Sequence, residues 1–253
     1  MINKIFNEPN TDTLIRMEDN YLDLTVTSPP YNVDLGNNKY NKNPYDMYND
    51  NKEHKEYISW LKDIFTLVYQ KTKKGGRCVI NIGDGQNGRV PTHSDIIQMM
   101  VNIGWIPMTT IIWDKNNVSS RTAWGSFKSP SSPSFPTPFE YIMAFAKEER
   151  KLQWKGESDL TNEEFVQWSL AKWTFTGENL KRVGHPAAFP IELPTRCVKM
   201  FSWVGSIVYD PFMGSGSTAI ACIKSGRNYI GSEISKEYVD LSSNRIEGIK
   251  VDN

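Results

Sequence analysis

The sequence has no apolar run long enough to cross a membrane, and it has too few cysteines for a disulfide or zinc framework. A membrane-spanning helix needs about 20 consecutive apolar residues, and the N-terminus also lacks the apolar core of a signal peptide. Cys78, Cys197 and Cys222 are widely separated, so we interpret them as small core residues in a reducing compartment. These absences predict a cytoplasmic protein with no membrane contact.

The sequence also lacks an excess of charge of either sign. It has 29 acidic and 29 basic residues, so its net charge is zero. A nucleic-acid-binding protein of this composition would need a local basic patch, because the overall balance supplies none. With 253 residues, the chain can bury a substantial core in one large domain or two small ones.

Strand-like runs alternate with helical patterns along the chain, which is typical of an α/β sheet. The run Lys73-Lys74-Gly75-Gly76 is expected to stop the first long helix. The composition of segments 33–51 and 114–138, which are rich in polar and turn residues, predicts that each forms a long loop. Apolar spacing predicts strands at 22–27, 77–82, 107–113, 140–146, 207–209 and 229–230, and helices at 54–72, 94–103, 218–224 and 238–246.

Residues 147–181 show no pattern that would place them in the sheet. They are charged and contain Trp154, Trp168 and Trp173. We interpret the segment as a small insert, with the three rings forming its core in preference to stacking on bases.

The run Thr27-Ser28-Pro29-Pro30-Tyr31-Asn32 follows the first strong strand. Neither proline can donate to a strand ladder, so pairing stops there and the chain becomes a stiff loop. The loop holds a hydroxyl, a backbone carbonyl and an aromatic ring in fixed relation. Open α/β sheets place their chemistry on such loops, although a plain turn or a polyproline ligand would share this local sequence.

A second candidate loop is Asp210-Pro211-Phe212-Met213-Gly214-Ser215-Gly216-Ser217-Thr218, between a predicted strand and a predicted helix. Its two glycines allow positive φ and close approach of the backbone to a ligand, and Thr218 is expected to cap the helix. Glu233 lies roughly 20 residues beyond the loop, the spacing at which a carboxylate binds ribose hydroxyls. The pattern therefore predicts a nucleoside-containing cofactor.

Two features of this loop oppose a phosphate ligand. It lacks the Gly-Lys-Ser/Thr ending of a P-loop, and Asp210 at the strand end would repel a pyrophosphate. The same carboxylate suits a cationic ammonium or sulfonium group. S-adenosylmethionine therefore fits the charge pattern better than NAD or ATP, and no metal is expected.

Together these loops resemble those of the amino-methylating DNA methyltransferases. The 210–218 run looks like their methionine-binding loop, and Thr27-Ser28-Pro29-Pro30-Tyr31 resembles their catalytic motif in the form most often seen in cytosine-N4 enzymes. His185-Pro186-Ala187-Ala188-Phe189-Pro190 is similar to the segment before the cofactor loop, and 226–233 matches its continuation. One departure is Glu8-Pro9, where the family often has Gly-Asp, which puts the usual acidic contact near the adenine in doubt.

The order of the motifs, catalytic before cofactor-binding, resembles the permuted β group of this family. The resemblance implies an α/β, Rossmann-like methyltransferase sheet, mostly parallel with an antiparallel hairpin strand and circularly permuted. Residues 1–146 would form the catalytic half, 147–182 a small target-recognition insert, and 183–253 the cofactor-binding half. It also suggests double-stranded DNA as substrate, a cognate restriction endonuclease as partner, a homodimer, and a restriction-modification or phage setting.

The resemblance implies methyl transfer from S-adenosylmethionine to the N4 amine of a flipped cytosine, leaving S-adenosylhomocysteine. Ser28 Oγ and the Pro29 carbonyl would accept hydrogen bonds from the amine on a loop stiffened by Pro30, and Tyr31 would stack on the base. Adenine-N6 methylation and a non-catalytic nucleic-acid-binding homologue stay open as alternatives. Because no cysteine follows a proline, the sequence opposes methylation at cytosine C5.

Further candidates are assigned to the cofactor and to DNA. His185 would contact the cofactor or shape a turn. Gly83-Asp84 would belong either to the loop structure or to the site. For Asn32 we favour a role in ending the turn over a hydrogen bond to the base. The cofactor-binding set is Thr27, His185, Asp210, Pro211, Phe212, Gly214, Ser215, Gly216, Thr218 and Glu233. The candidates for DNA phosphate contact are Arg121, Lys128, Lys181 and Arg182.

Overall fold

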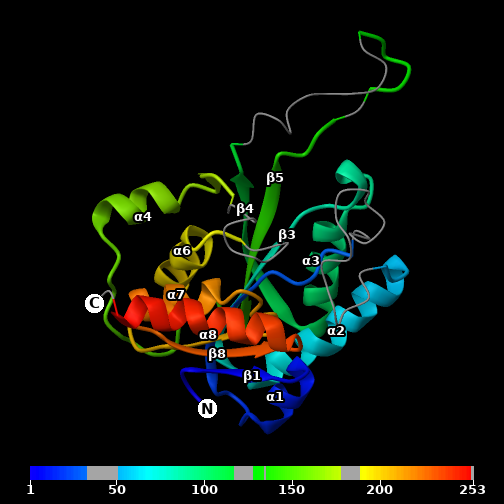
Figure 1. Ribbon diagram of the computed structural model, residues 1–253. Helices are drawn as coiled ribbons and strands as arrows, with labels where there is room; N and C mark the ends of the chain where they lie inside the picture. The colour runs from blue at the N-terminus through cyan, green and yellow to red at the C-terminus, as the bar shows by residue number, and fades with distance from the viewer. Residues whose placement is uncertain (33–50, 117–127, 134, 178–188, 252–253) are drawn as a thin grey trace.

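A single eight-stranded sheet organises the described part of the chain (Figure 1). The computed structural model describes residues 1–32, 51–116, 128–133, 135–177 and 189–251. The strand order is β1-β8-β7-β2-β3-β5-β4-β6. The strands are β1 (Lys4–Asn7), β2 (Leu22–Thr27), β3 (Thr72–Ile82), β4 (Trp105–Asp114), β5 (Phe139–Lys147), β6 (Lys172–Thr174), β7 (Ile207–Asp210) and β8 (Asn228–Glu233).

The sheet is parallel except at one strand. Strand β5 runs antiparallel to both of its neighbours, β3 and β4, and the other pairings are parallel. Strand β2 precedes β7 by most of the chain, yet the two are hydrogen-bonded neighbours. The predicted permuted, mostly parallel α/β sheet is confirmed.

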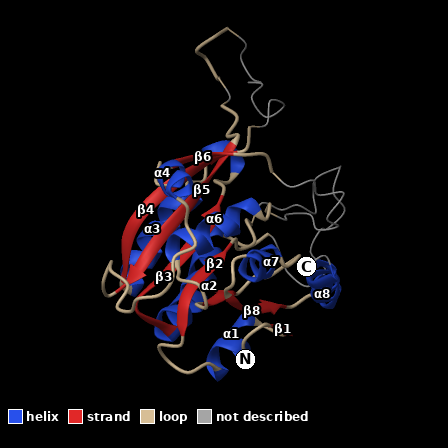
Figure 2. Cartoon of the chain, turned by 90° about the vertical axis from the view of Figure 1, so that its left-hand side faces the viewer, coloured by secondary structure: helices blue, strands red, loops and turns tan. Residues whose placement is uncertain are grey.

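Helices cover both faces of the sheet, as Figure 2 shows. The first buried cluster is packed under α1 (Asn10–Arg16), α2 (His54–Lys71) and α3 (Thr92–Ile103), and a short 3₁₀ turn, η2 (Gln86–Gly88), precedes α3. The second cluster lies under α4 (Asn162–Trp168), α6 (Glu192–Phe201), α7 (Ser217–Lys224) and α8 (Lys236–Val251). Because both faces are covered, all six residues of β2 are buried.

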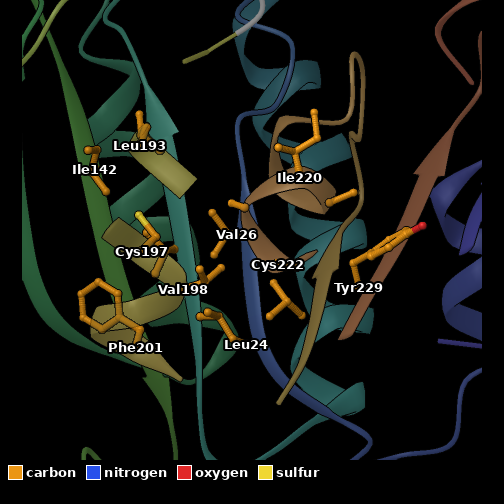
Figure 3. Close-up of a cluster of buried hydrophobic side chains, with 14 of the residues drawn as sticks. Leu24, Val26, Ile142, Leu193, Cys197, Val198, Phe201, Ile220, Cys222 and Tyr229 are labelled. Atoms are coloured by element: carbon orange, nitrogen blue, oxygen red, sulfur yellow. The ribbon is translucent and has the colours of Figure 1, made fainter. Parts of the chain in front are cut away.

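The second cluster contains two of the three cysteines, as Figure 3 shows. Cys197 of α6 and Cys222 of α7 pack with Val26 of β2, and Cys78 lies in the first cluster. All three are buried free thiols, and burial raises the pKa of each one. Their interpretation as core residues is confirmed. None of the helices in the described ranges is long and apolar enough to span a membrane.

The expected stop of the first long helix is wrong in its details. Helix α2 ends at Lys71, and Thr72 is already extended and begins β3. Gly75 has a φ of +76° and lies where the register against β2 shifts, between Leu22↔Thr72 and Leu24↔Arg77. A left-handed glycine can end a helix or form a bulge in a strand, and here it does the latter.

The segment 147–181 does enter the sheet, contrary to expectation. Strand β6 pairs in parallel with β4, with Ile112 opposite Lys172. Trp168 and Trp173 are buried in the main second cluster and do not form a separate insert core. The guanidinium of Arg196 lies over both rings, at 5.3 and 5.4 Å from their centroids. A three-residue strand is too short to show its period in sequence.

Candidate functional site

The two candidate loops lie side by side at one edge of the sheet. Strands β2 and β7 pair in parallel, with Thr25 opposite Tyr209, so both strands end at the same edge. The hydroxyl of Thr27 donates a 2.6 Å hydrogen bond to Asp210 Oδ1. This bond joins residues 183 positions apart in sequence, and it links the start of one loop to the start of the other.

Asp210 is the buried junction of the cofactor loop. Besides Thr27, Thr218 Oγ1 donates to its Oδ2 at 2.6 Å, and the Phe212 amide donates to Oδ1 at 3.0 Å. The expectation that Thr218 caps its helix is wrong. Helix α7 begins at Ser217 after Gly216, and the Thr218 hydroxyl is turned back to the carboxylate. A hydroxyl that donates a hydrogen bond to a buried charge contributes more to the stability of the fold than one that caps a helix end.

Two desolvated carboxylates end strands β7 and β8. Burial raises the pKa of Asp210 to about 6, against three hydrogen bonds that lower it. Burial also raises the pKa of Glu233, and the nearby charge of Asp210 acts in the same direction. Glu233 accepts backbone hydrogen bonds from Gly214 at 2.8 Å and Ser235 at 2.9 Å. The described residues therefore place negative charge beneath the cofactor loop, where a cationic ligand would be stabilised.

The glycines of the loop are required by the backbone and by its neighbours. Gly214 and Gly216 have φ values of +50° and +82°. A Cβ on Gly216 would lie 2.8 Å from Ser242 Cβ on α8, closer than carbon atoms can approach. The glycines were expected to allow close approach of a ligand, and the structure shows that Gly216 also allows close approach of a helix.

Phe212 is the partly exposed side chain of this loop. Its ring lies 5.5 Å from that of Trp60 on α2. The preceding residue, Pro211, accepts a 3.2 Å hydrogen bond from Asn10 Nδ2 of α1 through its carbonyl. Glu8, the departure from the family pattern, lies just before α1. Its carboxylate accepts a hydrogen bond from a residue of that helix, since Thr13 Oγ1 donates to it at 2.6 Å.

The catalytic-motif loop is anchored by α2. Tyr57 Oη donates to the Pro30 carbonyl at 2.7 Å. Asn32 has a φ of +56°, and its side-chain amide exchanges two 2.8 Å hydrogen bonds with the backbone of Lys52. Asn32 therefore ends the turn, as favoured from the sequence.

A polar network surrounds the motif, and sequence reasoning missed three of its members. Ser28 Oγ lies 3.2 Å from both the Asn81 carbonyl and Tyr31 Oη. Tyr31 Oη donates to Glu140 Oε2 at 2.8 Å, and Asn81 Nδ2 donates to the same oxygen at 2.7 Å. Lys115 forms an ion pair with Glu140 Oε1. The missed members are Asn81, Lys115 and Glu140. A signal did exist, because Asn81 and Glu140 each interrupt an apolar strand.

The remaining candidates have other contacts, or lie outside the described residues. Asp84 accepts hydrogen bonds from the His93 amide at 3.0 Å and pairs with its ring at 2.8 Å, so it organises the loop before α3. Lys128 is exposed between β4 and β5. His185, Arg121, Lys181 and Arg182 lie outside the described residues. In the described ranges, no group of three or more His, Cys, Asp or Glu side chains could hold a metal ion.

Comparison with known proteins points to one family. A family model described as DNA methylase, covering N6 and N4 enzymes, matches residues 22–244. The Type II methyltransferase M.MjaVI of Methanocaldococcus jannaschii is 39% identical over 192 residues, 72% of this chain and 95% of the relative. M.MjaI of the same organism is 33% identical over 269 residues, 92% of this chain and 88% of the relative.

Solved structures show the same fold. The chain is similar to TTHA0409 of Thermus thermophilus, a candidate DNA modification methylase solved with S-adenosyl-L-methionine, at a TM-score of 0.75 and 27% identity over 96% of this chain and 92% of that one. It also shares the fold of the cytosine-N4-specific PvuII DNA methyltransferase, at a TM-score of 0.70 and 20% identity over 96% and 85% of the two chains.

Proposed function

The chain belongs to the N6/N4 family of DNA methylases, and from that premise we propose that it methylates the N4 amine of cytosine in duplex DNA, using S-adenosylmethionine. The observation that carries the proposal is the 2.6 Å hydrogen bond from Thr27 to Asp210. It joins a loop suited to a cationic nucleoside cofactor to a loop that presents acceptors to an amine. Neither loop alone would support methyl transfer.

The residues of the cofactor loop fit S-adenosylmethionine. Glu233 accepts backbone hydrogen bonds from Gly214, Ser235 and Ile234. A carboxylate has about four lone-pair sites, so it keeps capacity to accept from the ribose. Asp210 is fully buried, so its charge acts on the methionine ammonium from beneath the loop. Phe212 is positioned to contact the cofactor from the α2 side. That TTHA0409 was solved with this cofactor adds support.

The remaining cofactor candidates divide into two groups. Pro211, Gly214, Ser215, Gly216 and Thr218 belong to the described loop, and we propose that their backbone lines the cofactor. Thr27 acts through Asp210. His185 stays a proposal from the resemblance alone, because it lies outside the described residues.

The catalytic loop performs the chemistry in this proposal. The bound cofactor supplies an electrophilic methyl group on a sulfonium sulfur. An exocyclic base amine is a poor nucleophile because its lone pair is delocalised into the ring. Ser28 Oγ and the Pro29 carbonyl accept hydrogen bonds from the amine, which localises that lone pair on nitrogen and aligns it. Tyr31 stacks on the base, which must leave the duplex to reach the loop.

Ser28 favours cytosine over adenine as the target base in this proposal. A serine hydroxyl is a neutral acceptor, and its motif resembles the cytosine-N4 form more than the adenine-N6 form. The relatives M.MjaVI and M.MjaI are Type II methyltransferases, which supports a role in restriction-modification beside a cognate endonuclease. We also propose a homodimer, with 147–182 contributing to target recognition and Arg121, Lys128, Lys181 and Arg182 to phosphate contact.

Product identification tests this function. Unmodified duplex DNA is incubated with the protein and methyl-labelled cofactor, digested to nucleosides and analysed by mass spectrometry. We expect N4-methylcytosine. N6-methyladenine as the sole product would overturn the cytosine assignment, and the absence of any labelled nucleoside would overturn the proposed function itself.

A further inference from the structure

We propose that Glu140 is a positioning residue for the catalytic loop, which fixes the direction of the hydrogen bonds around Ser28. The inference rests on the proposed function, since it assigns a part of that reaction to a residue outside both recognised motifs. Glu140 reaches the loop because β5 is antiparallel to β3. The amino end of β5 therefore lies at the edge where the parallel strands β2 and β3 end.

The environment of Glu140 is unusual for a strand residue. Its side chain is 9% exposed, and it stands between Phe139 and Tyr141 in a strand that continues with Ile142. Burying a carboxylate in such a strand is unfavourable unless the charge is paired and its oxygens accept hydrogen bonds. Both conditions hold, because Lys115 pairs with Oε1, and Tyr31 and Asn81 donate to Oε2.

The carboxylate decides which way the hydroxyl protons point. An ionised carboxylate only accepts hydrogen bonds, so the single hydroxyl proton of Tyr31 is directed to Glu140. Tyr31 Oη is then an acceptor towards Asn81 Nδ2, at 2.9 Å, and towards Ser28. The Ser28 proton goes to the Asn81 carbonyl or to Tyr31 Oη, both at 3.2 Å. Asn81 Nδ2 also makes a long, 3.5 Å hydrogen bond to Ser28 Oγ, so in either case one lone pair of Ser28 remains available to accept from an amine.

Asn81 shows that this orientation is imposed on the network. Its side chain is 1% exposed, and its Nδ2 is turned to Glu140 and Tyr31. Its Oδ1 is buried and has no hydrogen-bond partner among the described residues, which is unfavourable for a buried amide. The amide keeps this orientation because the opposite one would bring Oδ1 against the Glu140 carboxylate.

The network also holds the aromatic ring that would stack on the base. A Cβ added at Gly83 would lie 3.4 Å from both Glu140 Cγ and Tyr31 Cε2. Glu140 and the Tyr31 ring therefore lie on the same side of the Gly83 backbone, and both face its α-carbon. Loss of the carboxylate would release the Tyr31 hydroxyl and, through it, the direction of the Ser28 hydroxyl.

A double-mutant cycle tests the inference. Wild type, Glu140→Gln, Tyr31→Phe and the double variant are compared in single-turnover methylation of duplex DNA at saturating cofactor. We expect Glu140→Gln to slow the chemical step about 10- to 100-fold, with the DNA KM and the cofactor Kd within about twofold of wild type. The double variant should be no slower than the slower single variant, because both changes break one network. Glu140→Asp, which keeps the charge, should restore part of the rate.

The matched control is Glu149→Gln. Glu149 pairs with Lys74 at 2.7 Å near the opposite end of β5. The Glu149→Gln variant should methylate DNA at the wild-type rate. A Glu140→Gln rate within twofold of wild type, or single effects that multiply, would overturn the inference. If Glu140→Gln does not fold, Tyr31→Phe decides, since a wild-type rate without that hydroxyl is equally contradictory. Wild-type protein that methylates no DNA would instead overturn the proposed function.

Discussion

The two loops of the site are held in place in different ways. The cofactor loop is fixed partly from within, because the Thr218 hydroxyl and the Phe212 amide both donate to Asp210. It is fixed partly by the more distant Asn10, Thr27 and Glu233. The catalytic loop is fixed by distant side chains, with Tyr57, Asn81 and Glu140 up to 109 positions away. The comparison teaches that the 210–218 run supplies part of its own support around Asp210, whereas the short run Ser28–Tyr31 depends mainly on side chains from the sheet and from α2.

The difference predicts that the two loops separate binding from chemistry. Variants in the cofactor loop should lower cofactor affinity or the free energy of unfolding. Variants around the catalytic loop should lower the rate and leave cofactor affinity unchanged. The predictions below are ordered from the largest expected effect to the smallest.

Removal of the Ser28 hydroxyl should give the largest effect. Ser28→Ala should slow single-turnover methylation by about 100-fold or more, because an acceptor for the target amine is lost. Cofactor Kd, measured by calorimetry, should be unchanged. Ser94→Ala, at an exposed position on α3, is the control and should keep full activity. A Ser28→Ala rate equal to wild type would show that this hydroxyl has no part in the reaction.

The buried Asp210 should make the fold less stable as pH rises from 4 to 6. Burial raises its pKa from 3.8 to about 6, so the folded state favours the protonated carboxyl. As pH rises, the unfolded chain ionises first, and the contribution of Asp210 to stability falls by up to about 3 kcal/mol. It stays constant once pH exceeds the folded-state pKa.

Asp210→Asn removes this dependence. Glu8 and Glu164, with lowered pKa values, affect both proteins equally. The Asp210 charge raises the pKa of Glu233 in the wild type alone, which acts in the same direction as Asp210 itself. The free energy of unfolding of wild type minus that of the variant, from urea titrations, should therefore fall between pH 4 and 6 and then level off. A difference that rises over this range would contradict the assigned direction of the pKa shift.

Gly216→Ala should destabilise the cofactor loop through both strain and a clash. Gly205 provides a matched control, since its φ is +80° and an added Cβ would meet nothing within 4 Å, whereas at Gly216 it would meet Ser242. Gly205→Ala should cost about 1 kcal/mol of strain. Gly216→Ala should cost about 2 kcal/mol more and weaken cofactor binding. Equal losses in urea unfolding would mean that the helix contact is unimportant.

Tyr57→Phe should have the smallest effect. It removes one hydrogen bond to the Pro30 carbonyl, which is expected to lower stability by about 1 kcal/mol. The rate should fall a few-fold as the loop loosens, with cofactor affinity unchanged. A loss of affinity larger than the loss of rate would place Tyr57 on the cofactor side of the site.

Much of the fold could be predicted from periodicity. Strands β2, β5 and β7 and helix α2 appear within a few residues of their expected bounds, because buried strands and an amphipathic helix leave clear patterns. The missed elements are the short edge strands β1 and β6, whose pairing is decided by tertiary contacts, and the helices α1, α4 and α6. Lys73–Gly76 was misread because a left-handed glycine has more than one structural use.

The candidate site was predictable only where residues are consecutive. The 27–32 and 210–218 runs carry their chemistry in one stretch, and the structure brings them together as expected from strand order. Glu140 and Lys115 meet Tyr31 only through the antiparallel pairing of β5, which no local pattern specifies. The role of Thr218 was misassigned because its partner, a buried charge, is visible only in three dimensions.

The central claim is that one loop binds the cofactor and the other carries out the reaction. Calorimetric titration of S-adenosylmethionine into Ser28→Ala and Glu233→Ala tests this claim most directly. Glu233 accepts the backbone of the cofactor loop and would bind the ribose, so Glu233→Ala should weaken binding by about tenfold or more. Ser28→Ala should bind the cofactor as wild type does. Equal losses of affinity in both variants, or a loss only in Ser28→Ala, would contradict the account.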